Sequence, residues 1–118
     1  MPGSDYHPDK PREGKYPAAA RLTLAEAPGL RVRQLSLALG QCVPWHFHSE
    51  ITDTFFCMQG PMCVRTRSPD AEFILEPGDT IAIPPGRHHY AAGVDKQACA
   101  FMIVQGVGTY DYVPVEDR

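Results

Sequence analysis

The chain has 118 residues, of which 43% are hydrophobic and 21% are charged, and its formal net charge is -3. This length and composition predict one globular domain with a modest core, and the net charge gives no electrostatic footprint for nucleic acid or an anionic membrane. No apolar run is as long as a membrane span, and the first residues contain no hydrophobic leader segment. We therefore expect a cytoplasmic protein whose partners include neither nucleic acid nor a membrane.

The first segment of the chain differs in composition from the rest. Residues 1–17 are polar, rich in proline and without apolar periodicity, so we expect a flexible N-terminal arm there. Residues 18–118 are the expected folded domain. At its start, residues 18–27 are open to two interpretations, a strand in which apolar and polar residues alternate or a short helix.

Short apolar segments separated by turn residues continue through the rest of the chain. Strands are predicted over residues 30–39, 42–48, 54–58, 62–66, 71–75, 80–83, 89–92 and 98–104. Proline and glycine stand between them, as at Pro77-Gly78, the centre of a predicted type II turn. This spacing is typical of an all-β sandwich or a small barrel, and a barrel of this size can enclose one small ligand.

The four cysteines form no C-x-x-C pair, and most of them lie within apolar stretches. We therefore expect inert, buried thiols rather than a zinc or redox motif.

The histidines are few, yet two of them stand one residue apart. His46 and His48 lie in a predicted strand, so their side chains point to the same face. Two imidazoles on one face can bind a metal ion if further ligands approach from elsewhere. By itself such a pair is more often solvated or hydrogen-bonded than bound to a metal.

The residues around the histidines show two spaced motifs. The first consists of Gly40, His46-x-His48, Asp53 and Gly60, and the second of Gly78, Pro84-x-Gly86, His89 and Gly93. Together they resemble the two motifs of the cupin superfamily, G-x5-H-x-H-x(3,4)-E-x6-G and G-x5-P-x-G-x2-H-x3-N. The resemblance implies an antiparallel jelly-roll barrel, a double-stranded β-helix that is usually a homodimer. It also implies one divalent transition metal held by His46, His48, His89 and, in the glutamate position, Asp53.

Two positions depart from the cupin pattern. Asp53 replaces the glutamate and is one methylene shorter, so it could bind the metal directly, act through a water or leave a three-histidine site. Gly93 replaces an asparagine that is usually structural in the family. Glu50 is the rival carboxylate and His88 the rival third histidine, although the motif spacing favours Asp53 and His89. His7 lies in the polar arm, where we expect it to be solvated.

Strand alternation from Asp53 and His89 predicts which residues surround the metal. Phe55, Cys57 and Ala91 share their parity and are expected to line a substrate pocket, although Phe55 could equally be core packing. The neighbouring aromatic residues face the other way and are expected in a second layer or a dimer interface. Two arginines share a face of another strand, where they could hold a substrate carboxylate or simply be solvated. These outward or alternative positions are Trp45, Phe47, Tyr90, Arg65 and Arg67.

The resemblance predicts a small metal-dependent enzyme that acts on a small oxygenated metabolite. Among reaction classes we favour a dioxygenase over an isomerase or lyase. The alternatives are a non-catalytic module that binds a small molecule and a cupin whose metal is purely structural. Ligand type does not choose between iron, zinc, nickel and manganese. The sequence assigns no residue a catalytic role beyond metal binding.

Overall fold

The structure is a computed structural model that describes residues 6–7 and 16–116. In this part of the chain the fold is all-β, with one short 3-10 turn, η2 (Val94–Lys96). The strands are β1 (Tyr6–His7), β2 (Ala20–Ala27), β3 (Leu30–Leu37), β4 (Cys42–Phe47), β5 (Thr52–Gln59), β6 (Met62–Thr66), β7 (Ala71–Leu75), β8 (Thr80–Ile83), β9 (His89–Gly93), β10 (Cys99–Gly106) and β11 (Val113–Pro114). The all-β prediction is confirmed, and of the two interpretations of residues 18–27 the strand is the one observed.

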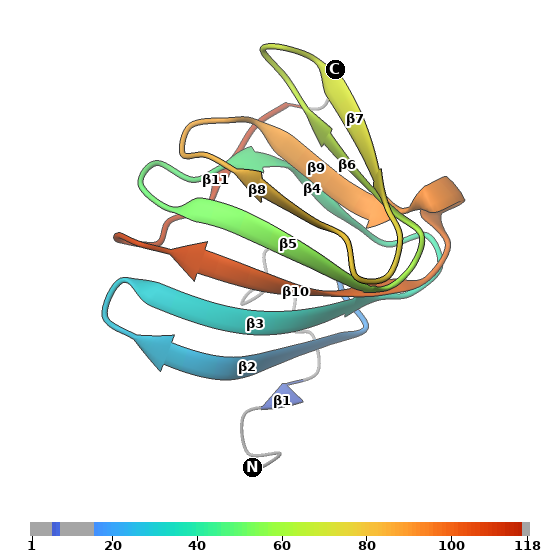
Figure 1. Cartoon of the computed structure of the whole chain (residues 1–118), viewed down its shortest axis with the longest axis horizontal. Helices are drawn as coiled ribbons and strands as arrows, with labels where there is room; N and C mark the ends of the chain where they lie inside the picture. The colour runs from blue at the N-terminus through green and yellow to red at the C-terminus, as the bar shows by residue number, and fades with distance from the viewer. Residues whose placement is uncertain (1–5, 8–15, 117–118) are drawn as a thin grey trace.

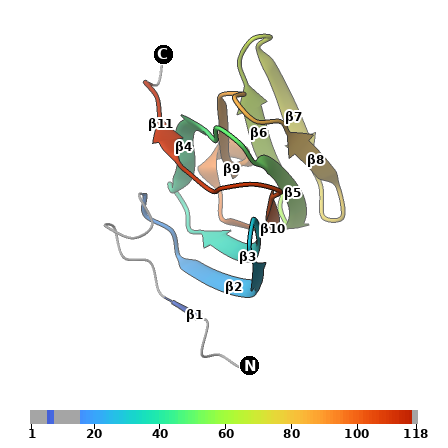
Figure 2. The ribbon, with the colours of Figure 1, turned by 90° about the vertical axis from the view of Figure 1, so that its left-hand side faces the viewer.

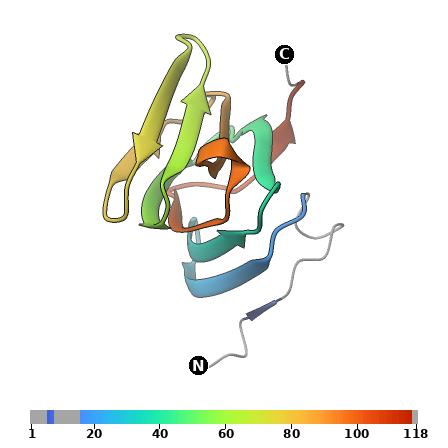
Figure 3. The same ribbon diagram turned by 90° about the vertical axis from the view of Figure 1, so that its right-hand side faces the viewer.

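The strands form two antiparallel sheets that face each other (Figures 1 and 3). One sheet has the order β1-β2-β3-β10-β5-β8 and the other the order β11-β4-β9-β6-β7. The expected arm, residues 1–17, lies mostly outside the described residues, although β1 within it pairs with β2. No helix in the described part is long or apolar enough to cross a lipid bilayer.

The core lies between the sheets and is built from alternate residues of each strand. Leu35 and Leu37 of β3, Phe55 of β5 and Phe101 of β10 are at most 2% exposed. The rings of Phe55 and Phe101 pack with their centroids 5.5 Å apart. This apolar packing fixes the register of the large sheet and, with it, every other residue on the inward face.

A β-bulge interrupts the alternation of β4. Val43 pairs with Ala91 and His46 with His89, so two residues of β4 oppose the single residue Tyr90 of β9. As a result Val43 and His46 are both buried, although regular alternation from Val43 would point His46 outward. The bulge therefore turns the face that carries His46 toward the interior.

The chain beyond β10 crosses one side of the sandwich before it reaches β11 beside β4 (Figure 2). Gly108 is tied to the β2–β3 turn by a hydrogen bond from its N–H to the carbonyl oxygen of Gly29, 3.0 Å long. This crossing brings residues 107–112, far away in sequence, over the histidines.

Gly93, where the cupin motif has asparagine, lies at a close approach of two backbone segments. A Cβ atom added there would stand 1.9 Å from the carbonyl oxygen of Gln97. No side chain fits at this position unless the backbone shifts, so the glycine is a requirement of the η2 turn.

We predict that restoring the family residue with Gly93→Asn destabilises the protein by about 1–3 kcal/mol, the usual cost of overpacking. Gly40→Asn is the matched control, because a Cβ there meets nothing within 4 Å and asparagine tolerates positive φ better than most residues. Urea denaturation of both variants measures the difference. A Gly93→Asn variant as stable as Gly40→Asn would contradict the steric argument.

Candidate metal centre

Four buried side chains meet between the sheets. His46 comes from β4, His48 follows that strand, Asp53 comes from β5 and His89 begins β9. One ligand atom from each lies within 4.8 Å of the others. His46 and His89 are paired on the neighbouring strands β4 and β9 of the five-stranded sheet, and the centroids of their rings lie 4.3 Å apart.

Each of the three histidines is oriented by a backbone carbonyl. The Nδ1 atom lies 2.7 Å from the oxygen of Pro44 for His46, 2.5 Å from that of Asp111 for His48 and 2.8 Å from that of Arg87 for His89. A carbonyl oxygen only accepts hydrogen bonds, so each Nδ1 must carry the proton. In the neutral ring this leaves the Nε2 lone pair free, and all three lone pairs point into the cluster.

Asp53 completes the cluster with a carboxylate. Its Oδ2 atom lies 2.8 Å from Nε2 of His89, 3.0 Å from Nε2 of His48 and 3.9 Å from Nε2 of His46. These atoms are all acceptors when the rings are neutral, so a positive charge must lie among them, either protons or a metal ion. Three imidazoles and a carboxylate are donors that divalent transition metals accept, so the residues fit such an ion.

The electrostatics of the site keep the carboxylate charged. In the absence of a metal, a histidine protonated at Nε2 can donate to this carboxylate. Burial by itself would raise the pKa of Asp53, but the neighbouring histidines outweigh burial and hold this pKa well below its usual range. Burial lowers the pKa of His46. For His48 burial acts in the same sense, yet the hydrogen bond to Asp53 and its charge prevail and raise the pKa.

A hydrogen-bond relay holds Asp53 from behind. Asp53, Gln105 and Arg31 are direct neighbours across β5, β10 and β3. Nε2 of Gln105 donates to Oδ1 of Asp53 over 3.0 Å, and the Arg31 guanidinium donates to Oε1 of Gln105 over 3.1 Å. The relay occupies Oδ1 and leaves Oδ2 as the oxygen that faces the histidines.

An enclosed inner cavity of about 30 Å³ adjoins the cluster. Its walls contain three of the four candidate ligands, apolar core residues, two arginines and three tyrosines. They are Tyr16, Arg21, Arg33, Leu35, Val43, His46, His48, Asp53, Phe55, Ile103, Gln105, Tyr110 and Tyr112. Of the residues expected to line a substrate pocket, Phe55 lies in this wall, whereas Cys57 and Ala91 are buried in the apolar core and are not part of it.

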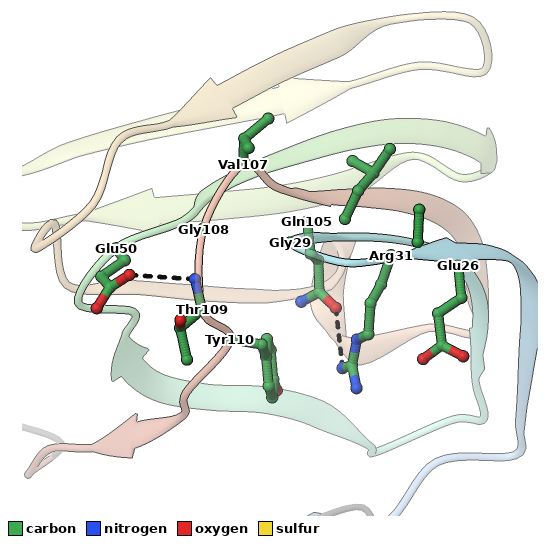
Figure 4. Close-up of a pocket in the computed structure, with 11 residues that line it drawn as sticks. Glu26, Gly29, Arg31, Glu50, Gln105, Val107, Gly108, Thr109 and Tyr110 are labelled. Atoms are coloured by element: carbon green, nitrogen blue, oxygen red, sulfur yellow. Dashed lines mark hydrogen bonds between the residues drawn. The ribbon is translucent and has the colours of Figure 1, made fainter.

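A larger outer pocket of about 760 Å³ lies next to the inner cavity (Figure 4). The β2–β3 turn, the loop before β5 and residues 107–110 surround it. Gln105 and Tyr110 line both spaces. Gln105 and Tyr110 therefore separate the pocket from the cavity, and on the pocket side the Arg31 guanidinium carbon lies 3.9 Å from the centre of the Tyr110 ring.

Comparison with known proteins agrees with this geometry. The sequence pattern described as "Cupin domain" matches residues 34–111, more than half of the chain. The chain belongs to the cupin family. The resemblance predicted from the two motifs is thereby confirmed.

Solved structures share the fold of this cupin at low sequence identity. An oxalate oxidase structure has 22% sequence identity and a TM-score of 0.66, and the match covers 74% of this chain and 46% of the oxalate oxidase chain. KdgF from Halomonas sp. has 19% sequence identity and a TM-score of 0.65, and the match covers 76% of this chain and 79% of the KdgF chain. A protein with a double-stranded β-helix domain from Klebsiella pneumoniae has 21% sequence identity and a TM-score of 0.68. This match covers 82% of this chain and 84% of the other. The cupin spans less than half the length of the oxalate oxidase chain, and no curated protein matches it.

The two rival ligands lie elsewhere in the cupin. Glu50 is exposed, and its carboxylate accepts a hydrogen bond from the backbone N–H of Thr109 over 3.1 Å (Figure 4). His88 stacks on Phe47 with ring centroids 5.1 Å apart. The structure does not describe the side chain of His7, which was expected to be solvated.

The outward residues of the small sheet form a cation–π surface away from the cavity. Arg67 lies 3.9 Å from the centre of the Trp45 ring, and Arg65 lies 5.8 Å from that of Tyr90. Arg65 also forms an exposed ion pair with Glu72. Arg65 and Arg67 therefore lie outside the inner cavity.

Sequence reasoning missed several residues around the cupin site. Arg31 and Arg33 share the strand parity of Leu35 and Leu37, which was a usable signal that they face inward. Tyr112, whose ring stacks on His46 with centroids 4.6 Å apart, gave no such signal. Its position depends on the chain crossing after β10.

We predict that Asp53→Asn lowers metal affinity, because it removes the charge of the carboxylate among the four candidate ligands. The loss should be at least roughly 10–100-fold, the usual effect of changing a residue that only hydrogen-bonds a ligand. Glu50→Gln is the matched control and should leave the metal content unchanged. Elemental analysis after dialysis against a graded chelator measures both. Loss of metal in Glu50→Gln with retention in Asp53→Asn would assign the carboxylate to the rival residue.

We also predict that metal retention falls as the pH is lowered, because a protonated imidazole has no lone pair to offer. The pKa of His48 is raised, so protons compete for this ligand from above the ordinary histidine value of about 6.5. Retention should be complete at high pH and decline progressively as the pH is lowered. His88→Ala should give the same curve, whereas retention unchanged down to about pH 4 would contradict histidine ligation.

Proposed function

We propose that this cupin is a metal-dependent enzyme that acts on a small oxygenated metabolite, with dioxygenase-type chemistry. The observation that carries the proposal is the convergence of three Nε2 lone pairs and one carboxylate oxygen beside an enclosed cavity. A closed structural site would use all positions for protein ligands, whereas this one faces space on one side. His46, His48, Asp53 and His89 are the proposed ligands.

When bound, a divalent transition metal would supply Lewis-acid or redox chemistry at this cavity. The chain's own residues perform the remaining tasks. The three carbonyl contacts hold each imidazole in the tautomer that presents Nε2. Gln105 fixes the orientation of Asp53. The apolar walls, Phe55 among them, limit water in the cavity.

The fold likeness supports the proposed chemistry only as an analogy. One similar structure is named an oxalate oxidase, and another is named an oxalate oxidase in complex with glycolate. Small oxygenated acids are therefore the first substrates to test. The identity of the metal, the expected homodimer and the cytoplasmic location stay predictions.

Oxygen consumption by the metal-loaded protein tests the proposal. The iron-loaded and manganese-loaded forms should consume oxygen with at least one of oxalate, glycolate or pyruvate, and His46→Ala should abolish this activity together with metal binding. His88→Ala should retain both. Substrate conversion without oxygen uptake would indicate an isomerase or lyase, and tight binding without conversion would indicate a binding module, each contradicting the dioxygenase proposal.

A further inference from the structure

A pocket lined by arginines lies at the turn that precedes β9, and we call it the 84–88 pocket. Its volume is about 340 Å³, and none of the four candidate metal ligands lines it. The walls come from the β6–β7 turn and from the residues between β8 and β9, and among the described residues no aspartate or glutamate belongs to them. The lining residues are Arg67, Ser68, Pro84, Pro85, Gly86, Arg87 and His88.

The sequence makes one wall of this pocket rigid. Pro84 and Pro85 each have a fixed φ, and Gly86 follows with a φ of 81°. The N–H of Arg87 closes the turn by donating to the carbonyl oxygen of Pro84 over 3.3 Å, the pattern of a type II turn. The N–H of Gly86 donates to the carbonyl oxygen of His48 over 2.8 Å. The wall is therefore ordered before a ligand binds, which lowers the entropic cost of binding.

Neutral acceptors hold the Arg87 side chain in place. Its Nε donates to the carbonyl oxygen of Arg67 over 3.1 Å, and its Nη2 donates to Oγ1 of Thr66 and to the carbonyl oxygen of Pro69, each over 3.3 Å. Within the described part of the chain, Nη1 makes no hydrogen bond, and it is not buried. One edge of a fixed guanidinium therefore remains open at the pocket.

Arg67 is a second cation whose contacts are all neutral. Its guanidinium lies over the Trp45 ring, its Nη1 donates to the carbonyl oxygen of Glu116 over 2.9 Å, and its Nη2 is buried without a hydrogen-bond partner among the described residues. Arg65 differs, because its Nε forms an ion pair over 3.3 Å with a glutamate of β7. No described carboxylate forms an ion pair with Arg67 or Arg87, so two positive charges in this pocket lack an anionic partner.

Two neutral hydrogen-bonding groups stand beside the arginines. The His88 ring stacks face to face on Phe47, with an interplanar angle of 7°, which leaves its nitrogen atoms at the ring edge. Ser68 adds an exposed hydroxyl, and neither side chain has a hydrogen-bond partner in the part of the chain that the structure describes. Guanidinium, imidazole N–H and hydroxyl groups are all donors, so the set suits a ligand with several acceptor oxygens.

We propose that the 84–88 pocket binds a phosphate group, either inorganic phosphate or the phosphate monoester of a small metabolite. The two arginine charges match a dianion better than the single charge of a carboxylate, and the guanidinium fork fits phosphate oxygens. A volume of about 340 Å³ is within the range of pockets for small molecules, so an organic part has room beside the phosphate. The acidic residues that share a pocket with Arg67, Asp70 and Glu72, line a different one beside Trp45.

Calorimetric titration at about pH 8, where phosphate monoesters are dianions, tests the proposal with inorganic phosphate, glycerol 3-phosphate and acetate. Phosphate should bind wild type at least about 10-fold more tightly than acetate does, and Arg87→Gln should weaken phosphate binding about 10–100-fold, the effect of losing a charge-assisted hydrogen bond. Arg87→Lys should keep part of the affinity, because it retains the charge without the fork. Arg65→Gln removes a charge outside the pocket and is the matched control, which should bind phosphate as wild type does.

Thermal unfolding separates a binding role of the arginines from a structural one. Phosphate should raise the Tm of wild type and of Arg65→Gln with increasing concentration, and this rise should be lost in Arg67→Gln and Arg87→Gln, whatever their Tm without ligand. If a glutamine variant does not fold, Arg67→Lys and Arg87→Lys provide the test, and each should bind phosphate more weakly than wild type. Wild-type affinity in both lysine variants, no saturable phosphate binding by wild type, or equally tight acetate binding would overturn the proposal.

His46→Ala distinguishes phosphate in the pocket from phosphate bound to a metal. This control is needed because the same turn supports two candidate ligands: the carbonyl oxygen of Arg87 faces Nδ1 of His89, and Gly86 bonds to His48. Unchanged phosphate affinity in His46→Ala supports the pocket, whereas its loss together with the metal overturns the proposal.

The two phosphate ligands identify the source of the phosphate group. Tighter binding of glycerol 3-phosphate supports the site with a phosphorylated metabolite as its ligand, and tighter binding of inorganic phosphate supports it with the free ion. The proposal does not rest on the proposed function. Failure of phosphate to bind leaves the metal-dependent enzyme intact, and absence of metal leaves the phosphate site to be decided by the same titration.

Discussion

The site depends on the mutual repulsion of four acceptor atoms held a few ångströms apart. Backbone carbonyls from three separate segments force Nδ1 of each histidine to carry its proton, so the Nε2 lone pairs meet one another and the Asp53 carboxylate. Such an arrangement is stable only with a cation at its centre. The surrounding fold supplies the rigidity that keeps the four atoms together, because backbone groups and core packing hold the rings.

The strand register of the six-stranded sheet fixes the position of the Asp53 carboxylate. The apolar contacts of Phe55 with Phe101 set the alignment of β5 on β10, and this alignment places Gln105 beside Asp53. The next strand adds Arg31 to the same row. A slip of one residue would send all three polar side chains to the outer face, so the core and the site share one constraint.

The arginines of the two sheets lie in different surroundings. Arg21 and Arg33 face the cavity, while the ion pair and cation–π contacts of Arg65 and Arg67 lie outside it. The cavity therefore has cationic side chains in its wall beside the candidate metal ligands.

The sequence by itself determined the strands, the turn glycines and the four candidate ligands. Alternation and punctuation by proline and glycine are local signals, and the spacing of His46, His48, Asp53 and His89 is a linear pattern. Only the tertiary structure decided which face is inside. Alternation from Val43 would have buried Trp45, and a bulge that contains Pro44 reverses it. The carbonyl of Asp111 and the inward arginines likewise act through pairing and chain crossing between distant segments, and a linear sequence does not encode those contacts locally.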